Sequence, residues 1–105
     1  MAEYEQITVK SFSLADYQWA IYTDAYESTI DPIPDANGAV AAAKELWQEE
    51  YGESYDQTYG RPVEVFYDAA QECWLLKGAI PEWVLGAVPC ALIRSDGTVL
   101  ALWWD

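Results

Sequence analysis

The feature that most constrains the fold is a change of hydrophobic period partway along the chain. Before it, an alanine-rich stripe recurs at helical intervals, and from Arg61 onward the period shifts toward two. A helix with one apolar stripe must bury that stripe, and an antiparallel sheet offers a matching face. The order therefore predicts an α+β domain in which a helix lies across an antiparallel sheet.

The most strongly patterned helix is predicted over residues 36–51. Asp35 or Asn37 is suited to cap its start, and Gly52 stands where a left-handed C-terminal cap is favoured. Small side chains on the stripe allow a close approach to the sheet, while Trp47 and Tyr51 fill the wider end. The stripe comprises Ala36, Ala39, Val40, Ala43, Leu46, Trp47 and Tyr51.

A first helix is predicted over residues 14–26. Ser13 and Asp16 have the spacing of an N-terminal cap, and two prolines in residues 30–34 end the helix. Its predicted inner face carries Ala15, Trp19, Tyr22 and Tyr26, and its outer face carries Asp16, Tyr17, Asp24 and Glu27. Residues 1–12 are expected to form either a loose arm or a short edge strand.

The second half of the chain predicts a four-stranded antiparallel meander. Strand-like segments cover residues 62–67, 73–80, 88–94 and 98–104, and residues 53–60 form a polar loop. The predicted connections are residues 68–71, 81–86 and 95–97, of which Ser95-Asp96-Gly97 is the strongest turn signal. We expect one domain over residues 1–105, monomeric or weakly homodimeric.

The charge of the chain excludes several functions. It has 18 Asp and Glu against five Lys and Arg, no histidine, and a formal net charge of −13. This composition lacks the commonest general base and metal ligand, and it disfavours nucleic acid as a ligand. We expect no cofactor and no metal site. No apolar run reaches the length of a membrane span and residues 1–10 lack signal-peptide character, which predicts a cytoplasmic protein.

The acidity is accompanied by six Trp and eight Tyr residues. Large aromatic side chains are rigid anchors in protein interfaces, and carboxylates attract cationic surfaces. The composition therefore indicates a protein that binds a basic protein partner rather than an enzyme.

The order of motifs resembles the NTF2-fold immunity proteins of bacterial polymorphic toxin systems. The resemblance runs from the helix with Trp47 through Tyr51-Gly52 and Arg61-Pro62 to the later motifs, which are Trp74-x-x-x-Gly78, Pro81 and the turn at Asp96-Gly97. The chain departs from the family pattern at Leu85-Gly86, where a pair of glycines is common. The resemblance implies an NTF2-like or cystatin-like cone that binds and neutralises a cognate toxin domain.

The sequence offers three candidate contact regions, each with a plain structural alternative. The first is the end of the second helix and the loop after it, otherwise a solvated helix end: Glu49, Glu50, Glu53, Tyr55, Asp56 and Tyr59. The second is the outer face of the first helix, otherwise a solvated acidic face: Asp16, Tyr17, Asp24 and Glu27. The third contains Trp83, Trp103 and Trp104. The tandem pair must place one ring on each side of the sheet, where core filling is the alternative to an interface role.

Other functions remain open from the sequence. A small NTF2-like protein could bind an apolar molecule in a pocket or be a degenerate enzyme, with Asp68 beside Tyr67 as an acid, although a hairpin role suits Asp68 better. A homodimeric scaffold is a third class. Cys73 and Cys90 are expected to be buried thiols, with a cross-strand disulfide as the alternative.

Overall fold

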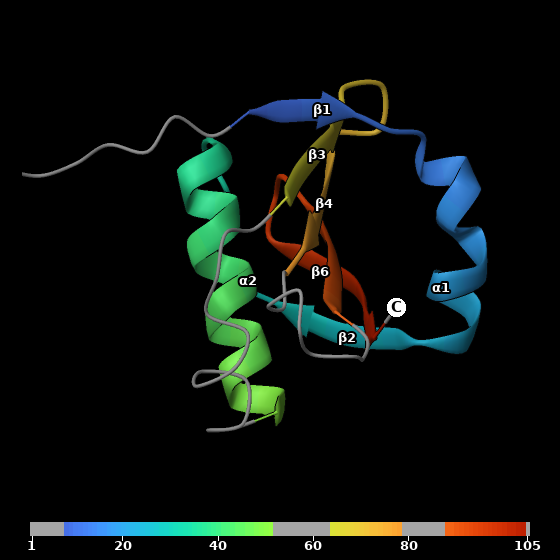
Figure 1. The fold of residues 1–105 in the computed structure, drawn as a ribbon, viewed down its shortest axis with the longest axis vertical. Helices are drawn as coiled ribbons and strands as arrows, with labels where there is room; N and C mark the ends of the chain where they lie inside the picture. Colours follow the sequence, from blue (N-terminus) through green and yellow to red (C-terminus); the bar gives the residue numbers. More distant parts are fainter. Residues whose placement is uncertain (1–7, 52–63, 79–87, 105) are drawn as a thin grey trace, which may run out of the picture.

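A computed structural model of the protein describes residues 8–51, 64–78 and 88–104, apart from the side chain of Glu27. Figure 1 shows the elements in chain order. They are β1 (Val9–Ser11), the 3-10 helix η1 (Leu14–Tyr17), α1 (Gln18–Thr23), β2 (Ala25–Thr29), α2 (Ala36–Tyr51), β3 (Glu64–Asp68), β4 (Cys73–Lys77), β5 (Pro89–Arg94) and β6 (Thr98–Trp104). The architecture is α+β, as predicted.

The six described strands form one open sheet in the order β1-β3-β4-β5-β6-β2. Its centre is the predicted antiparallel meander, β3 to β6. Two strands from the N-terminal half extend the meander: β1 pairs in parallel with β3, and β2 pairs antiparallel with β6. Of the two expectations for residues 1–12, the edge strand is confirmed for Val9–Ser11.

The two helices cover opposite faces of the sheet, which makes three layers (Figure 1). α2 has the predicted bounds, and Asp35 caps it by accepting a 2.8 Å hydrogen bond from the Gly38 amide. Both layers are held by apolar side chains, because strand residues alternate between the two faces. The α2 side includes Ala39, Ala43, Leu46, Trp47, Val65, Trp74, Leu76, Ile93 and Leu102, and the α1 side includes Leu14, Ala20, Cys73, Leu75, Cys90, Leu92, Ala101 and Trp103.

The prediction of one helix over residues 14–26 is wrong in its second half. The helical segment ends at Thr23, and Ala25–Thr29 is a strand. β6 would otherwise have no described partner on this side, and pairing with it gives the backbone of residues 25–29 a ladder of hydrogen bonds. Tertiary pairing therefore overrides the helical spacing that Tyr26 shares with the residues before it.

The predicted turns at both ends of the meander are confirmed. The Asp68 carboxylate accepts hydrogen bonds from the amides of Ala70 and Gln71 within the β3–β4 turn, and from the amide of Leu14 at 2.8 Å. Asp68 therefore has the hairpin role and also ties η1 to the sheet. Gly97 has a positive φ of 97°, and a Cβ there would collide with the Ile30 carbonyl.

A β-bulge interrupts the pairing of β5 with β6. Leu92 pairs with Ala101 and Ile93 pairs with Val99, so Leu100 is an extra residue in β6. Leu100 and Ala101 consequently pack on the same side of the sheet, toward α1. Beyond the bulge, Leu102 faces α2 and Trp103 faces α1.

The two cysteines are buried free thiols. Cys73 pairs with Arg94 and Cys90 pairs with Lys77, four positions away along the ladder. This offset separates them by about 14 Å, which is far beyond disulfide reach and excludes the alternative of a disulfide. Burial raises the pKa of the Cys73 thiol to about 12.

No helix in the described parts of the chain is long and apolar enough to cross a membrane.

Candidate binding surface

The C-terminal end of α2 meets the ends of two strands. Glu49 and Glu50 are exposed there, and the Tyr51 ring lies against the Trp104 ring at the end of β6, with 4.7 Å between ring centroids. Tyr26, on β2, is near enough to the Glu50 and Glu49 carboxylates for their charges to raise its pKa, beyond the larger effect of burial. We call these five residues, Tyr26, Glu49, Glu50, Tyr51 and Trp104, the α2-end cluster.

The carboxylates of the α2-end cluster act on its two tyrosines. Burial raises the pKa of Tyr26, and the nearby carboxylates of Glu50 and Glu49 raise it further. The pKa of Tyr51 is raised by burial and by Glu50, against a hydrogen bond with Trp104 that lowers it, while Asp24 raises it. Both phenols therefore stay neutral beside a concentrated negative charge.

The structure brings part of the second predicted contact region close to the first. Glu49 and Glu50 lie in the α2-end cluster, and Asp24, predicted on a separate helix face, acts on Tyr51 at the same place. The other predicted contact residues of the loop, and one of the tryptophans, fall outside the described residues: Glu53, Tyr55, Asp56, Tyr59 and Trp83. The side chain of Glu27 is also outside the description, although its backbone belongs to β2.

The face assignment predicted for the first helix is wrong for Tyr17, Trp19 and Tyr22. Tyr17, expected to face solvent, packs against the α1-side core. Trp19 and Tyr22, expected to face inward, are 48% and 83% exposed. The 3-10 turn before α1 changes the angular spacing of the side chains, and Leu14, Ala20 and Ile21 provide the buried contacts instead. Asp16 is exposed as predicted.

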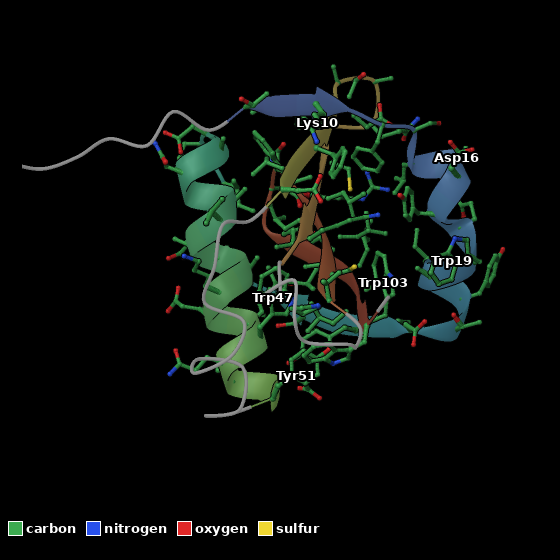
Figure 2. The ribbon with its side chains drawn as sticks, in the orientation of Figure 1. Lys10, Asp16, Trp19, Trp47, Tyr51 and Trp103 are labelled. Atoms are coloured by element: carbon green, nitrogen blue, oxygen red, sulfur yellow. The ribbon has the colours of Figure 1, made fainter. Side chains whose placement is uncertain are left out.

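An exposed stripe therefore runs along η1 and α1 at intervals of three residues, and we call Asp16, Trp19 and Tyr22 the α1 stripe. The Trp19 ring packs on two other rings. Its centroid lies 5.5 Å from that of Trp103, in an edge-on arrangement, and 6.3 Å from that of Tyr17. Figure 2 shows Trp19 and Trp103 on the α1 side of the sheet and Trp47 and Tyr51 on the α2 side. A ring already fixed by its neighbours loses little entropy when a partner binds.

The tandem tryptophans occupy both sides of the sheet, as the strand pattern required. Trp103 is buried under the first helix, which confirms the core-filling alternative for that residue. Trp104 is 37% exposed and belongs to the α2-end cluster.

Of the four described cations, Lys44 stands earlier on α2 than Glu49, and the other three contact residues outside the α2-end cluster and the α1 stripe. Lys10 pairs with Glu64 at 3.0 Å on the opposite edge of the sheet, and Lys77 lies over the rings of Tyr17 and Phe66. Arg94 donates a hydrogen bond to the Gln71 carbonyl. Residues 11–43 and 95–105 contain no Lys or Arg, so α1, β2 and β6 carry no positive side chain.

The described core contains no polar or charged side chain among its buried residues. Within the described ranges, three or more Asp, Glu, Cys and His side chains nowhere gather as a metal site. The Asp68 carboxylate, considered above as an acid, is engaged by three backbone amides that lower its pKa. What the described surface presents is negative charge beside fixed aromatic rings, an arrangement suited to recognition of a cationic protein surface.

Comparisons with protein-family models, with curated proteins and with solved structures find no match to this chain.

Proposed function

We propose that this protein is a non-catalytic inhibitor of the immunity-protein type that binds and neutralises a basic bacterial toxin domain. The observation that carries the proposal is the α2-end cluster, where Glu49 and Glu50 flank the rings of Tyr26, Tyr51 and Trp104. The resemblance of the motif order to NTF2-fold immunity proteins gives the class of partner. On this proposal the protein acts in the cytoplasm of the cell that makes the toxin.

The placement of the carboxylates supports a binding role. Glu49 and Glu50 stand in the last turn of α2, which has no basic residue. Negative charge at the C-terminal end of a helix opposes the helix dipole and costs a few tenths of a kcal/mol or more. Binding to a partner would explain why the chain keeps these two carboxylates at the end of α2. Carboxylates steer a basic partner and raise association rates about 10 to 1,000-fold.

The proposal includes a fold of the NTF2-like or cystatin-like cone type. The long α2 across an antiparallel meander supports it. η1 and α1 pack on the face of the sheet opposite α2.

Co-expression tests the proposal. The polypeptide encoded beside this chain is produced in bacteria with and without it, and growth and complex formation are measured. We expect growth arrest without this chain, and growth with it. Glu50→Lys is expected to slow association about tenfold or more, since it places a cation against a basic surface.

The matched control is Glu72→Lys, which changes the net charge equally at the exposed β3–β4 turn. It is expected to alter association less than about twofold, because exposed charges beyond a Debye length are screened. Equal effects of the two variants would reject the α2-end cluster as the contact site. Absence of any complex or rescue would reject the proposed function itself.

A further inference from the structure

We propose that β2 is a docking edge to which an extended segment of the basic partner adds as a further strand, with alternating cationic and apolar side chains. The inference rests on the proposed function for the identity of the partner and extends it to a mode of binding. It joins the α2-end cluster and the α1 stripe into one continuous surface.

The position of β2 is the first observation. β2 is at the end of the strand order, and none of the described strands pairs with its outer side. Its regular part pairs Ser28 with Val99 and Thr29 with Thr98, so the outer backbone groups there follow a strand geometry. Outward N–H and C=O groups on an edge strand are a template for another chain.

The second observation is the contrast between the two edges of the described sheet. β1 has only three residues and carries Lys10, which pairs with Glu64 and lies over the Phe66 ring. A short strand with a lysine is a common protection against unwanted pairing. β2 has five residues and no lysine, and Ala25 and Thr29 are exposed on it. This edge lacks the lysine that the other edge has.

The third observation is what flanks β2 on either side. Toward α1 lies an open groove of about 630 Å³ with a largely apolar lining, which includes Ile21, Tyr22, Ala25, Thr29, Val99 and Leu100. Toward α2 lies the α2-end cluster, to which β2 itself contributes Tyr26. Figure 1 shows β2 crossing from the end of α1 toward α2. Because strand side chains alternate, an added strand would direct one row to the groove and the other to Glu49 and Glu50.

Charge decides between a basic partner and a second copy of this chain. Residues 11–43 contain five carboxylates and no cation: Asp16, Asp24, Glu27, Asp31 and Asp35. Pairing β2 with β2 of a second copy would bring two such segments together, and like-charge contacts of this kind are unfavourable. A strand bearing Lys or Arg at alternate positions meets complementary charge instead.

The test uses the full chain and a short synthetic peptide of alternating valine and lysine, with a valine and glutamate peptide as reference. Amide NMR is expected to show lysine-peptide contacts at Ala25, Ser28, Thr29 and Tyr22. Ala25→Lys is expected to weaken binding about tenfold or more, since it adds a like charge at the edge. Val9→Lys adds the same charge at the exposed opposite edge and should change binding less than about twofold.

Thr29→Lys repeats the test at the second exposed position of β2, in case Ala25→Lys impairs folding. Contacts confined to β1 or to the end of α2, equal effects at both edges, or no peptide binding would overturn the inference. Self-association abolished by Ala25→Lys would also overturn it, because a second copy would then occupy β2. Toxin binding that is lost in Glu50→Lys and kept in Ala25→Lys would leave the proposed function standing and remove this binding mode.

Discussion

The two carboxylates at the end of α2 influence their neighbours before any partner arrives. Burial raises the pKa of Tyr26 on β2 and of Tyr51 on α2, and the charge of Glu50 raises both further. A protonated phenol keeps its hydrogen-bond donor, so both rings offer a partner an apolar face and a polar edge together. The α2-end cluster is therefore an electrostatic unit assembled from residues far apart in sequence.

Removing one charge tests that unit. Glu50→Gln is expected to lower the pKa of Tyr26 toward its ordinary value of 10.0, because the repulsion that disfavours phenolate is lost. NMR titration of the tyrosine ring signals, assigned with Tyr26→Phe, measures the change. Glu45→Gln, an exposed carboxylate earlier on α2, serves as control and should leave the titration of Tyr26 unchanged. An equal shift in both variants would argue against the local contact.

Sequence reasoning identified only part of this site. Glu49 and Glu50 could be found because a helix end with adverse charge is visible in one continuous segment. Tyr26 and Trp104 could not be joined to them, since their proximity depends on β2 pairing with β6 and on the phase of β6 beyond its bulge. The signal that was available for Trp104 was its place in a tandem pair, which required one ring on each side of the sheet.

At the scale of elements, a helix or strand could be predicted from the sequence when its hydrophobic pattern extended over enough residues. α2 was predictable because its helical period runs along the whole element after Asp35, and the four meander strands were predictable as apolar runs separated by turn residues, although the bulge in β6 was not. The first helix was too short for its hydrophobic pattern to show which face is buried. The 3-10 turn before it also changed the direction in which the following side chains point. β2 forms because it pairs with β6, and this pairing cannot be predicted from the sequence of residues 25–29 alone.

The face that α1 presents can be checked by stability. Tyr17→Ala is expected to reduce the free energy of unfolding by about 1–3 kcal/mol, since Tyr17 packs against Phe12 and Trp103. Tyr22→Ala is expected to change it by less than about 0.5 kcal/mol, because the side chain is 83% exposed. Urea denaturation of the two variants measures both values. The reverse order would mean that α1 buries the opposite face.

At the scale of the whole molecule, Asp68 connects distant parts of the chain. Its carboxylate accepts hydrogen bonds from Leu14 at the start of η1 and from the β3–β4 turn. The hydrogen bond from the Leu14 amide lowers the pKa of Asp68 most, burial acts in the opposite direction, and the amides of Gln71 and Ala70 lower the pKa further. The N-terminal layer is thus attached to the sheet by an ionised group.

The stability provided by Asp68 should depend on pH. Its pKa is lower in the folded than in the unfolded chain, so this stabilisation is fully present above the unfolded value of 3.8 and is lost as the pH falls through the folded value. The difference in free energy of unfolding between the natural chain and Asp68→Ala is therefore expected to shrink below about pH 4. Denaturation curves at neutral and acidic pH measure it. A difference that stays constant would show that the carboxylate charge is not involved.

The extra residue in β6 has a consequence for which surface a partner meets. Had the strand alternated regularly from the Ser95–Gly97 turn to its end, Trp103 would have pointed toward α2 and Trp104 toward α1. Tyr51 would then have faced a different indole ring, and Trp19 would have lost the support beneath it. A single irregularity in one ladder thus selects which of two adjacent tryptophans is hidden and which is displayed.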